Sequence, residues 1–350
     1  MEVNNKQQLI KDFINTLPEV NAVYGYGSGV INQIGSGAKC GQIDLIVVVN
    51  DTEKFHIKNL ELNPNYYTKS AKKFFLKYKL LHSFGADICY IPYIKYKENK
   101  FKIGVISRSS LIDDLTNWKN LYMAGRFQKP MVEFKTNKNI NNAIESNHKN
   151  ALLISLLLQN SSYCTLYDLY HTLLSLSYMG DIRTGLTINN KKILNFENPH
   201  KIDNIIAGSY KELNKIYLSK NINNNYFKVI CNQDMEFKFD DSLSQGEINE
   251  IIIDNLKNIK IHYSRKDLAE QLVFLPRNLN AYLASELHYI IDSDIVSIKQ
   301  LDSIKKELIK YIVKTNQKTT IRQALKGFLT VGLNDSLCYL KEKAEKAKTK

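Results

Sequence analysis

A glycine–serine turn followed by one aspartate in an apolar run is the part of this 350-residue sequence best suited to chemistry. Gly27, Ser28 and Gly29 lie in the stretch YGYGSGV, and Asp44 lies in IDLIVVV. Glycines let the backbone approach phosphate oxygens closely and present N–H groups to them, and a serine hydroxyl can donate to a terminal phosphate. A carboxylate that faces this turn can hold a divalent metal ion between phosphates. These residue types therefore indicate a site for a nucleoside triphosphate.

The order of these features is that of nucleotidyltransferases of the DNA polymerase beta type, in which a strand, a Gly-Ser turn and a second strand bearing aspartate follow one another. A Walker loop is excluded because no GK[ST] follows the glycines. Such sites usually carry two carboxylates as Asp-x-Asp, but Asp44 is followed by Leu45 and Ile46. The alternative interpretation is a glycine-rich hairpin whose carboxylates are only solvated at strand ends.

A second metal ligand would have to come from elsewhere in the chain. Asp51 ends the same predicted strand, but seven residues beyond Asp44 it points to the opposite face of a regular strand. Asp87, in GADICYI, begins a neighbouring predicted strand and is the better geometric candidate. We therefore predict Asp44 as the first metal ligand and Asp87 as the second.

Hydrophobic spacing predicts the elements that must position these residues. Residues 6–17 and 67–85 have the spacing of amphipathic helices, and the second of these is basic. Four stretches read as strands: NAVYGYG, IDLIVVV, ADICYIPYIKY and KFKIGVIS. From about residue 140 the pattern is mainly helical, and the Asn-rich stretch 136–150 is the expected boundary. We predict an α/β fold in which a small mixed sheet precedes a mainly helical part.

Composition narrows the class of protein without fixing its partner. The net charge of +13 favours an anionic partner, which could be a nucleic acid, a nucleotide or an acidic membrane surface. The 21 tyrosines lack the spacing typical of RNA-binding strands, so we expect no nucleic-acid partner. The five cysteines form no CxxC pair, which argues against a zinc site. Apolar runs are too short to span a bilayer, so we expect a soluble or peripheral protein.

Longer segments resemble the mitochondrial translocator assembly and maintenance protein family, whose members are soluble-type phosphatidate cytidylyltransferases. The similarity runs in order through YGYGSGV, IDLIVVVND, FHIKNLELNPNYYT, GADICYIP, KIGVIS, LIDDLTNWKNLYMAGRFQKP, YMGDIR and TTIRQALKGFLTVGL. The resemblance implies a nucleotidyltransferase domain, a helical winged-helix-like domain and a C-terminal membrane-associating helix. We expect these three parts at residues 1–135, 136–318 and 319–350.

The resemblance implies the magnesium-dependent reaction of CTP with phosphatidate, which gives CDP-diacylglycerol and pyrophosphate. It assigns phosphate binding to the Gly-Ser-Gly turn and the metal to Asp44, and it does not support a metal role for Asp87. Asn59 and Asn63 match family positions beside His56, where Phe55 replaces a tryptophan. The predicted catalytic residues are Ser28, Asp44 and Asp181, and the predicted substrate-binding residues are Gly27, Ser28, Gly29, His56, Arg126, Lys129, Arg183, Arg322 and Lys326.

The basic residues among these candidates suit a phosphate acceptor. A phosphate monoester is already ionised near neutral pH and needs no general base, but its approach to a triphosphate needs charge neutralisation. Arg126 and Lys129 could supply it, as could Arg322 and Lys326, which share a helical face one turn apart. The alternative in each case is an exposed, solvated charge. Two rival functions stay open: a nucleotidyltransferase acting on RNA, protein or a small hydroxyl compound, and a non-catalytic adaptor that kept the fold.

The lipid substrate requires contact with a membrane. Apolar residues between 321 and 340 fall mostly on one helical stripe beside a lysine-rich tail: Ile321, Leu325, Phe328, Leu329, Leu333, Leu337 and Leu340. A basic amphipathic helix of this kind lies at an anionic interface, unless the stripe packs on the protein itself. The N-terminus lacks a transit pattern. We therefore expect a bacterial relative on the cytoplasmic face of the cell membrane, whereas eukaryotic relatives act at the mitochondrial inner membrane.

Overall fold

The computed structural model describes residues 2–27, 29–31, 42–69, 71–72, 84–181, 199–218, 227–230, 244–287 and 298–331. Its larger sheet contains β1 (Ala22–Tyr26), β2 (Ile43–Val49), β3 (Ile88–Tyr96), β4 (Asn99–Ser107) and β5 (Val132–Lys135). The strands lie in the order β3-β4-β2-β1-β5, and β2 pairs in parallel with β4 while the other pairs are antiparallel. The four predicted strands and the mixed sheet are confirmed.

The central strand β2 is buried on both faces of the sheet, as its apolar sequence predicts. Leu45 and Val47 face a core under α1 (Glu2–Ile14) and α2 (Thr52–Leu62). The short turn η1 (Pro64–Tyr66) follows α2. Ile46 and Val48 face the opposite core, which contains side chains from α4 (Arg108–Asn117), α5 (Tyr122–Phe127) and α6 (Lys138–Leu157). The predicted helix at residues 6–17 is confirmed by α1, and most of the helix expected at 67–85 lies outside the described residues.

The Asn-rich stretch that we predicted as a boundary is helical and forms the first half of α6. The Asn137 side chain caps this helix by accepting the N–H groups of residues 139 and 140. Asn147 is buried and accepts a hydrogen bond from the Trp118 indole while it donates to the Ala124 carbonyl. Asparagine is tolerated inside this helix because its amide satisfies buried partners on other elements. Trp118 is fully buried in the core.

The remaining described elements form a mainly helical part, as predicted, and this part also contains a small three-stranded sheet that was not predicted. β6 (Tyr163–Thr165), β8 (Lys260–Tyr263) and β7 (Phe227–Ile230) pair in that order, and both pairs are antiparallel. The largest buried cluster among the described residues lies mainly in this part, and it also includes Trp118, Leu121, Ala124 and the C-terminal half of α6. Its helices are α7 (Leu166–Ser175), α8 (Pro199–Leu213), η4 (Asn214–Leu218), α9 (Gln245–Asn258), α10 (Arg265–Glu270), η5 (Gln271–Phe274) and α11 (Arg277–Leu287).

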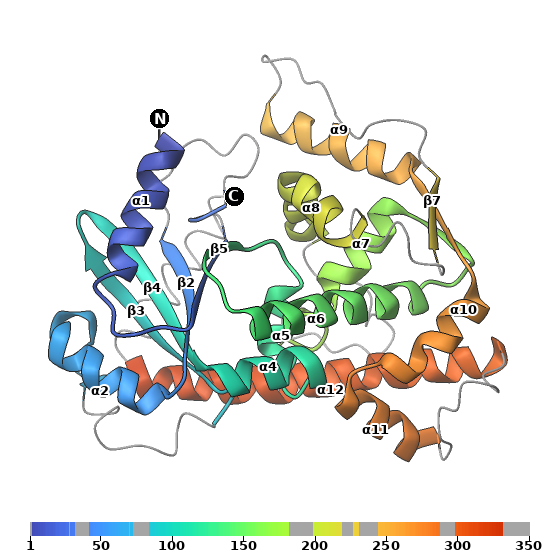
Figure 1. Ribbon diagram of the computed structural model, residues 1–350. Coiled ribbons are helices and arrows are strands. Elements are labelled where there is room, and N and C mark those ends of the chain that lie inside the picture. Colours follow the sequence, from blue (N-terminus) through green and yellow to red (C-terminus); the bar gives the residue numbers. More distant parts are fainter. Residues whose placement is uncertain are drawn as a thin grey trace.

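The long helix α12 (Ile298–Val331) runs along one side of the molecule and joins both parts, as the red helix in Figure 1 shows. The boundary expected between residues 318 and 319 falls inside it. Near the sheet, the Gln323 amide accepts a hydrogen bond from the Ala86 N–H at 3.1 Å and donates to the Ile88 carbonyl at 3.3 Å. Lys326 is 1% exposed and donates to the Phe84 carbonyl at 3.0 Å.

The predicted C-terminal stripe falls only partly within the described residues. Ile321 and Leu325 are 40% and 51% exposed on α12, so neither packs fully on the protein itself. The side chains of Phe328 and Leu329, and all of Leu333, Leu337 and Leu340, lie outside the described residues. Within the described part of the chain, no helix combines the length and the apolar character that a membrane span needs.

Lys326 gives a test of how α12 is held against the sheet. We expect Lys326→Ala to lower the free energy of unfolding by about 2–4 kcal/mol, because it leaves a cavity and removes a charged donor from a buried carbonyl. The matched control is Lys318→Ala, an exposed lysine on the same helix, for which we expect a change within about 0.5 kcal/mol. Urea denaturation measures both values, and equal stabilities of the two variants would contradict this role.

Candidate active site

A cavity of about 390 Å³ is lined by residues from the end of β1, from α5, from α8 and from α12. Four of the predicted site residues line it, although they come from separate segments: Gly27, Arg126, Lys129 and Asp181. Its other walls are formed by the end of β1, the turn after α7 and polar side chains of α12, and they include Tyr26, Ile31, Leu121, Tyr122, Gly125, Pro130, Ser177, Tyr178, Ile205, Ser209, Asn316, Thr319 and Thr320.

The glycine turn at the end of β1 has a geometry that requires glycine at two positions. Gly27 has a φ of +74°, in the left-handed region, and its carbonyl accepts the N–H groups of Val30 and Ile31 at 3.0 and 2.9 Å. A Cβ on Gly29 would lie 2.0 Å from the Gln42 carbonyl oxygen. The backbone therefore folds into a tight turn at the cavity wall. Ser28, the hydroxyl predicted to bind phosphate, lies outside the described residues.

Asp44 lies beside this turn, as predicted. It pairs with Tyr26 across the antiparallel strands β1 and β2. Its Oδ2 atom is 3.9 Å from the position that a Cβ would take on Gly27, and its Oδ1 atom is 3.7 Å from the Lys102 ammonium. Lys102 in turn lies over the Tyr90 ring, 4.7 Å from its centroid. One carboxylate oxygen thus points toward the turn while the other faces a lysine.

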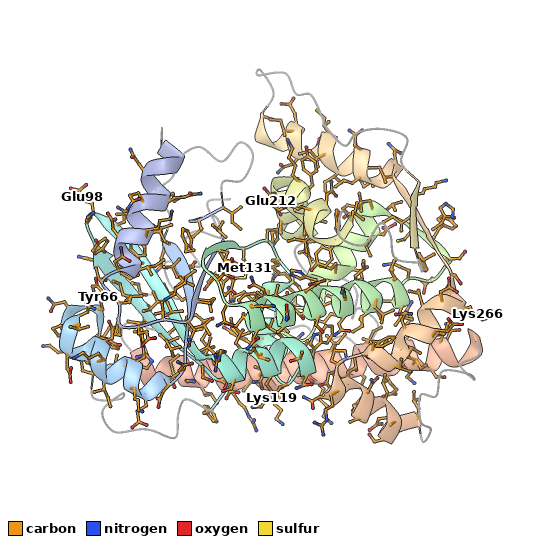
Figure 2. All side chains as sticks on the ribbon, in the orientation of Figure 1. Tyr66, Glu98, Lys119, Met131, Glu212 and Lys266 are labelled. Atoms are coloured by element: carbon orange, nitrogen blue, oxygen red, sulfur yellow. The ribbon has the colours of Figure 1, made fainter. Side chains whose placement is uncertain are left out.

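The prediction that Asp87 supplies the second metal ligand beside Asp44 is wrong. In the sheet, Asp44 lies opposite Lys102 of β4, whereas Ile88, the residue after Asp87, lies opposite Ile106 of the same strand. The two carboxylates are therefore separated by at least four residues along β4, or roughly 13 Å. Asp87 instead accepts hydrogen bonds from Lys119 at 3.1 Å and from an asparagine amide. Figure 2 shows Lys119 at the edge of the molecule that α12 follows, far from Met131, the neighbour of the cavity residue Pro130.

Arg126 is held between aromatic rings at the cavity wall. Its guanidinium carbon lies 4.3 Å from the centroid of the Tyr26 ring and 5.8 Å from that of Tyr122. Burial acts to lower the pKa of Arg126, but the surrounding tyrosines and the Asp44 carboxylate raise it well above its ordinary value, so the guanidinium stays charged. Among the described residues, the buried Nε of Arg126 and the buried hydroxyl of Tyr26 have no hydrogen-bond partner. Both groups can therefore donate to a bound anion.

Lys129 and Asp181 complete the polar wall. The Lys129 ammonium lies 3.9 Å from the centroid of the Tyr178 ring, so a second cation is stacked on a tyrosine. Asp181 is 5% exposed and follows Gly180, whose φ is +77° and whose Cβ would lie 2.4 Å from the Val313 carbonyl oxygen. This close approach fixes the turn after α7 on α12. Arg183, predicted from the same motif, lies outside the described residues.

Besides Gly29, three described residues that we predicted to bind substrate do not line the cavity. His56 is buried on the sheet face covered by α2, where its Nδ1 lies 3.0 Å from the Tyr67 hydroxyl. Asn59 donates to the same hydroxyl, and Asn63 donates to the side-chain oxygen of Asn59. These hydrogen bonds show that the motif stabilises the segment after α2. Lys326 is buried against Phe84, and Arg322 is exposed on α12. Asp51, set aside earlier as a metal ligand, caps α2 with its side chain.

The aromatic groups that position the cations were not predicted from the sequence. Tyr122 precedes Arg126 by four residues, a spacing that places two side chains on one helical face and could have been recognised. Tyr26 and Tyr178 gave no such local signal, because each reaches its cation from another segment. Asp114 was also missed, although its buried carboxylate holds the start of α5.

The sequence matches known proteins over most of its length. The Tam41/Mmp37 family, described as "Phosphatidate cytidylyltransferase, mitochondrial", matches residues 10–346. The protein of that name from Schizosaccharomyces pombe is 30% identical over 93% of this chain and 80% of its own length. The Dictyostelium discoideum protein is 30% identical over 98% of this chain and 85% of its own. The Mus musculus protein is 27% identical over 94% and 90%.

Arg126 gives a test of the stacked cation. We expect Arg126→Met to weaken CTP binding about 10- to 100-fold, because a hydrogen bond from a charged donor contributes about 1.5–3 kcal/mol. Arg126→Lys should restore little, since an ammonium lacks the planar donors that the rings orient. Titration calorimetry measures the affinities, with exposed Arg322→Met as the control that retains full affinity. An Arg126→Lys variant with unchanged affinity would contradict the importance of the planar group.

Proposed function

The chain belongs to the Tam41/Mmp37 family of phosphatidate cytidylyltransferases, and from this premise we propose that the cavity beside the Gly27 turn is its active site. The reaction transfers the cytidylyl group of CTP to the phosphate of phosphatidate, which gives CDP-diacylglycerol and releases pyrophosphate. One observation carries the proposal: Gly27, Arg126, Lys129 and Asp181, predicted from separate motifs, line one cavity next to Asp44.

The arrangement of elements supports the finer domain assignment. A sheet in which a glycine turn and a strand aspartate adjoin fits a nucleotidyltransferase domain within residues 1–135. The antiparallel strands β6, β8 and β7 beside α7 and α9 fit a winged-helix-like part in the following residues. The cavity takes walls from both parts. We therefore propose that the nucleotide binds on the sheet side while the helical part closes the site.

The residues of the cavity are suited to bringing two phosphates together. The amides of the turn at 27–29, with Ser28, bind the triphosphate, and Arg126 and Lys129 neutralise the charges of the approaching phosphates. The acceptor oxygen is ionised without a general base, so mutual repulsion of the substrates is the main obstacle. Fixed cations lower that obstacle most in a site from which water is largely excluded. Asp181, at the end of the α7 turn, orients the bound substrate from the opposite wall.

The residues around Asp44 fit a magnesium ion held largely by substrate. Mg²⁺ beside nucleotides is typically bound through one or two carboxylates together with phosphate oxygens and water. Asp44 offers Oδ2 on the side of the turn, and the described residues contain no cluster of three or more His, Cys, Asp or Glu ligands. When bound, the ion would neutralise charge on the leaving pyrophosphate. Asp44 is thus proposed as its protein ligand.

Phosphatidate is a membrane lipid, and we propose that the enzyme meets it as a peripheral protein. The exposed Ile321 and Leu325 flank the exposed Arg322 on α12, a combination that suits an anionic membrane surface. The names of the relatives place those proteins in mitochondria. In a bacterial member the corresponding surface is the cytoplasmic face of the cell membrane. No nucleic-acid partner is included in this proposal.

One assay tests the proposed reaction. Purified protein is incubated with labelled CTP, Mg²⁺ and liposomes that contain phosphatidate, and lipid products are separated. A labelled CDP-lipid that depends on phosphatidate is the expected result. Label transferred only to RNA, protein or a hydroxyl compound would favour another nucleotidyltransferase activity. No transfer to any acceptor, by protein that is folded, would favour the non-catalytic alternative.

Asp44 gives the sharpest test of the proposed site. We expect Asp44→Asn to lower kcat at least about 100-fold and to raise the Mg²⁺ concentration needed for half-maximal rate, because an amide binds the ion weakly. The control is Asp254→Asn, a surface carboxylate on α9 that should leave both quantities unchanged. The same assay at increasing Mg²⁺ measures them. An Asp44→Asn enzyme with the unaltered rate and metal requirement would exclude Asp44 as a ligand.

A further inference from the structure

Asp114, at the end of α4, accepts four backbone hydrogen bonds from one short segment. Its Oδ1 atom accepts the N–H groups of Asn120 at 2.6 Å and Leu121 at 2.9 Å. Its Oδ2 atom accepts those of Met123 at 2.8 Å and Ala124 at 3.1 Å. The side chain is only 2% exposed. Burial raises the pKa of the Asp114 carboxyl, and the four N–H donors act in the opposite direction.

The segment that Asp114 holds has a backbone that would not form without support. Trp118 and Leu121 have φ values of 52° and 57°, in the left-handed region that costs a non-glycine residue free energy. Leu121 precedes α5 and supplies no capping side chain. Asp114 supplies that cap from another helix, whereas α4, α7 and α9 are capped by their own serine or threonine. The α5 segment therefore depends on a long-range contact for its conformation.

The same segment carries the cations of the cavity. Tyr122 and Arg126 are in α5, and Lys129 follows it. Gly125 packs so closely on the α7 turn that a Cβ would lie 2.5 Å from Ser177 Cβ. A shift of α5 would therefore move the guanidinium relative to the opposite wall. Displacement of a catalytic or binding group by about 1 Å can cost on the order of 100-fold in rate.

We propose that Asp114 is a positioning residue for the transfer reaction. It acts through α5, because it fixes the place and orientation of Arg126. This inference rests on the proposed function for the reaction itself, but the link between Asp114 and Arg126 can also be measured as CTP affinity. Asparagine cannot replace the carboxylate, because its NH₂ group would face two of the N–H donors. A neutral side chain at 114 therefore leaves α5 displaced although the rest of the fold remains.

The experiment is a double-mutant cycle between Asp114→Asn and Arg126→Met. We expect Asp114→Asn to lower kcat/KM and CTP affinity about 10- to 100-fold, and the double variant to be no worse than Arg126→Met alone. Asp113→Asn is the matched control, since this neighbouring carboxylate is 42% exposed and paired with Lys119. Fold changes that multiply in the double variant, or full activity of Asp114→Asn, would overturn the proposal.

A second variant keeps the test decisive if Asp114→Asn does not fold. Tyr311 donates to the Trp118 carbonyl at 3.0 Å, so Tyr311→Phe loosens the same segment without touching the carboxylate. Trp118 is the one tryptophan of the chain, and its fluorescence reports on this segment directly. We expect altered emission and a smaller loss of CTP affinity that again disappears in the Arg126→Met background. An altered emission with unchanged affinity would show that the segment does not position Arg126.

If the wild type binds CTP but makes no CDP-lipid, the proposed reaction fails, while the coupling between Asp114 and Arg126 can still be measured as CTP affinity.

Discussion

Charge has to be concentrated on one wall of this cavity without being cancelled there. The protein stacks a guanidinium on Tyr26 and an ammonium on Tyr178, and it keeps a single carboxylate, Asp44, beside the glycine turn. A cation–π contact stabilises by about 0.5–2 kcal/mol. For the planar guanidinium of Arg126 it uses the face of the group, and the N–H donors at its edge stay directed elsewhere. A salt bridge would instead use those donors. The wall is therefore rich in oriented positive charge, as a reaction between two phosphates requires.

Such a wall works only if its parts do not move relative to one another. The sheet supplies the turn, α5 supplies the arginine, and the α7 turn supplies Asp181. The helix α12 connects them through polar side chains that bond to backbone groups: Asn316 donates to the carbonyls of residues 176 and 179, and Gln323 bonds to residues 86 and 88. These bonds are specific in direction, so they fix the register of α12 in a way that apolar packing alone would not.

Local patterns predicted the strands, the glycine turn, the position of Asp44 beside it and the family, because these depend on short segments or on long motifs. The prediction of Asp87 as a ligand beside Asp44 failed because β3 runs antiparallel to β4, which places Asp87 at the other end of the strands, and strand direction and register do not follow from local spacing. His56 and Lys326 matched motifs or charge patterns but proved to be buried beside backbone or side-chain partners. Asp114 could not have been singled out, since its four partners are brought to it only by the fold.

The place of α12 at the end of the described chain has a consequence for biosynthesis. A ribosome delivers the sheet and α5 early, and the domain they belong to can begin to fold during synthesis. The polar floor of the cavity, with Asn316, Thr319 and Thr320, belongs to α12 and is therefore synthesised after the sheet and α5. A nascent chain thus carries the glycine turn before the residues that complete the cavity have been made. We therefore expect the cavity to close only when α12 docks on the parts of the fold that precede it.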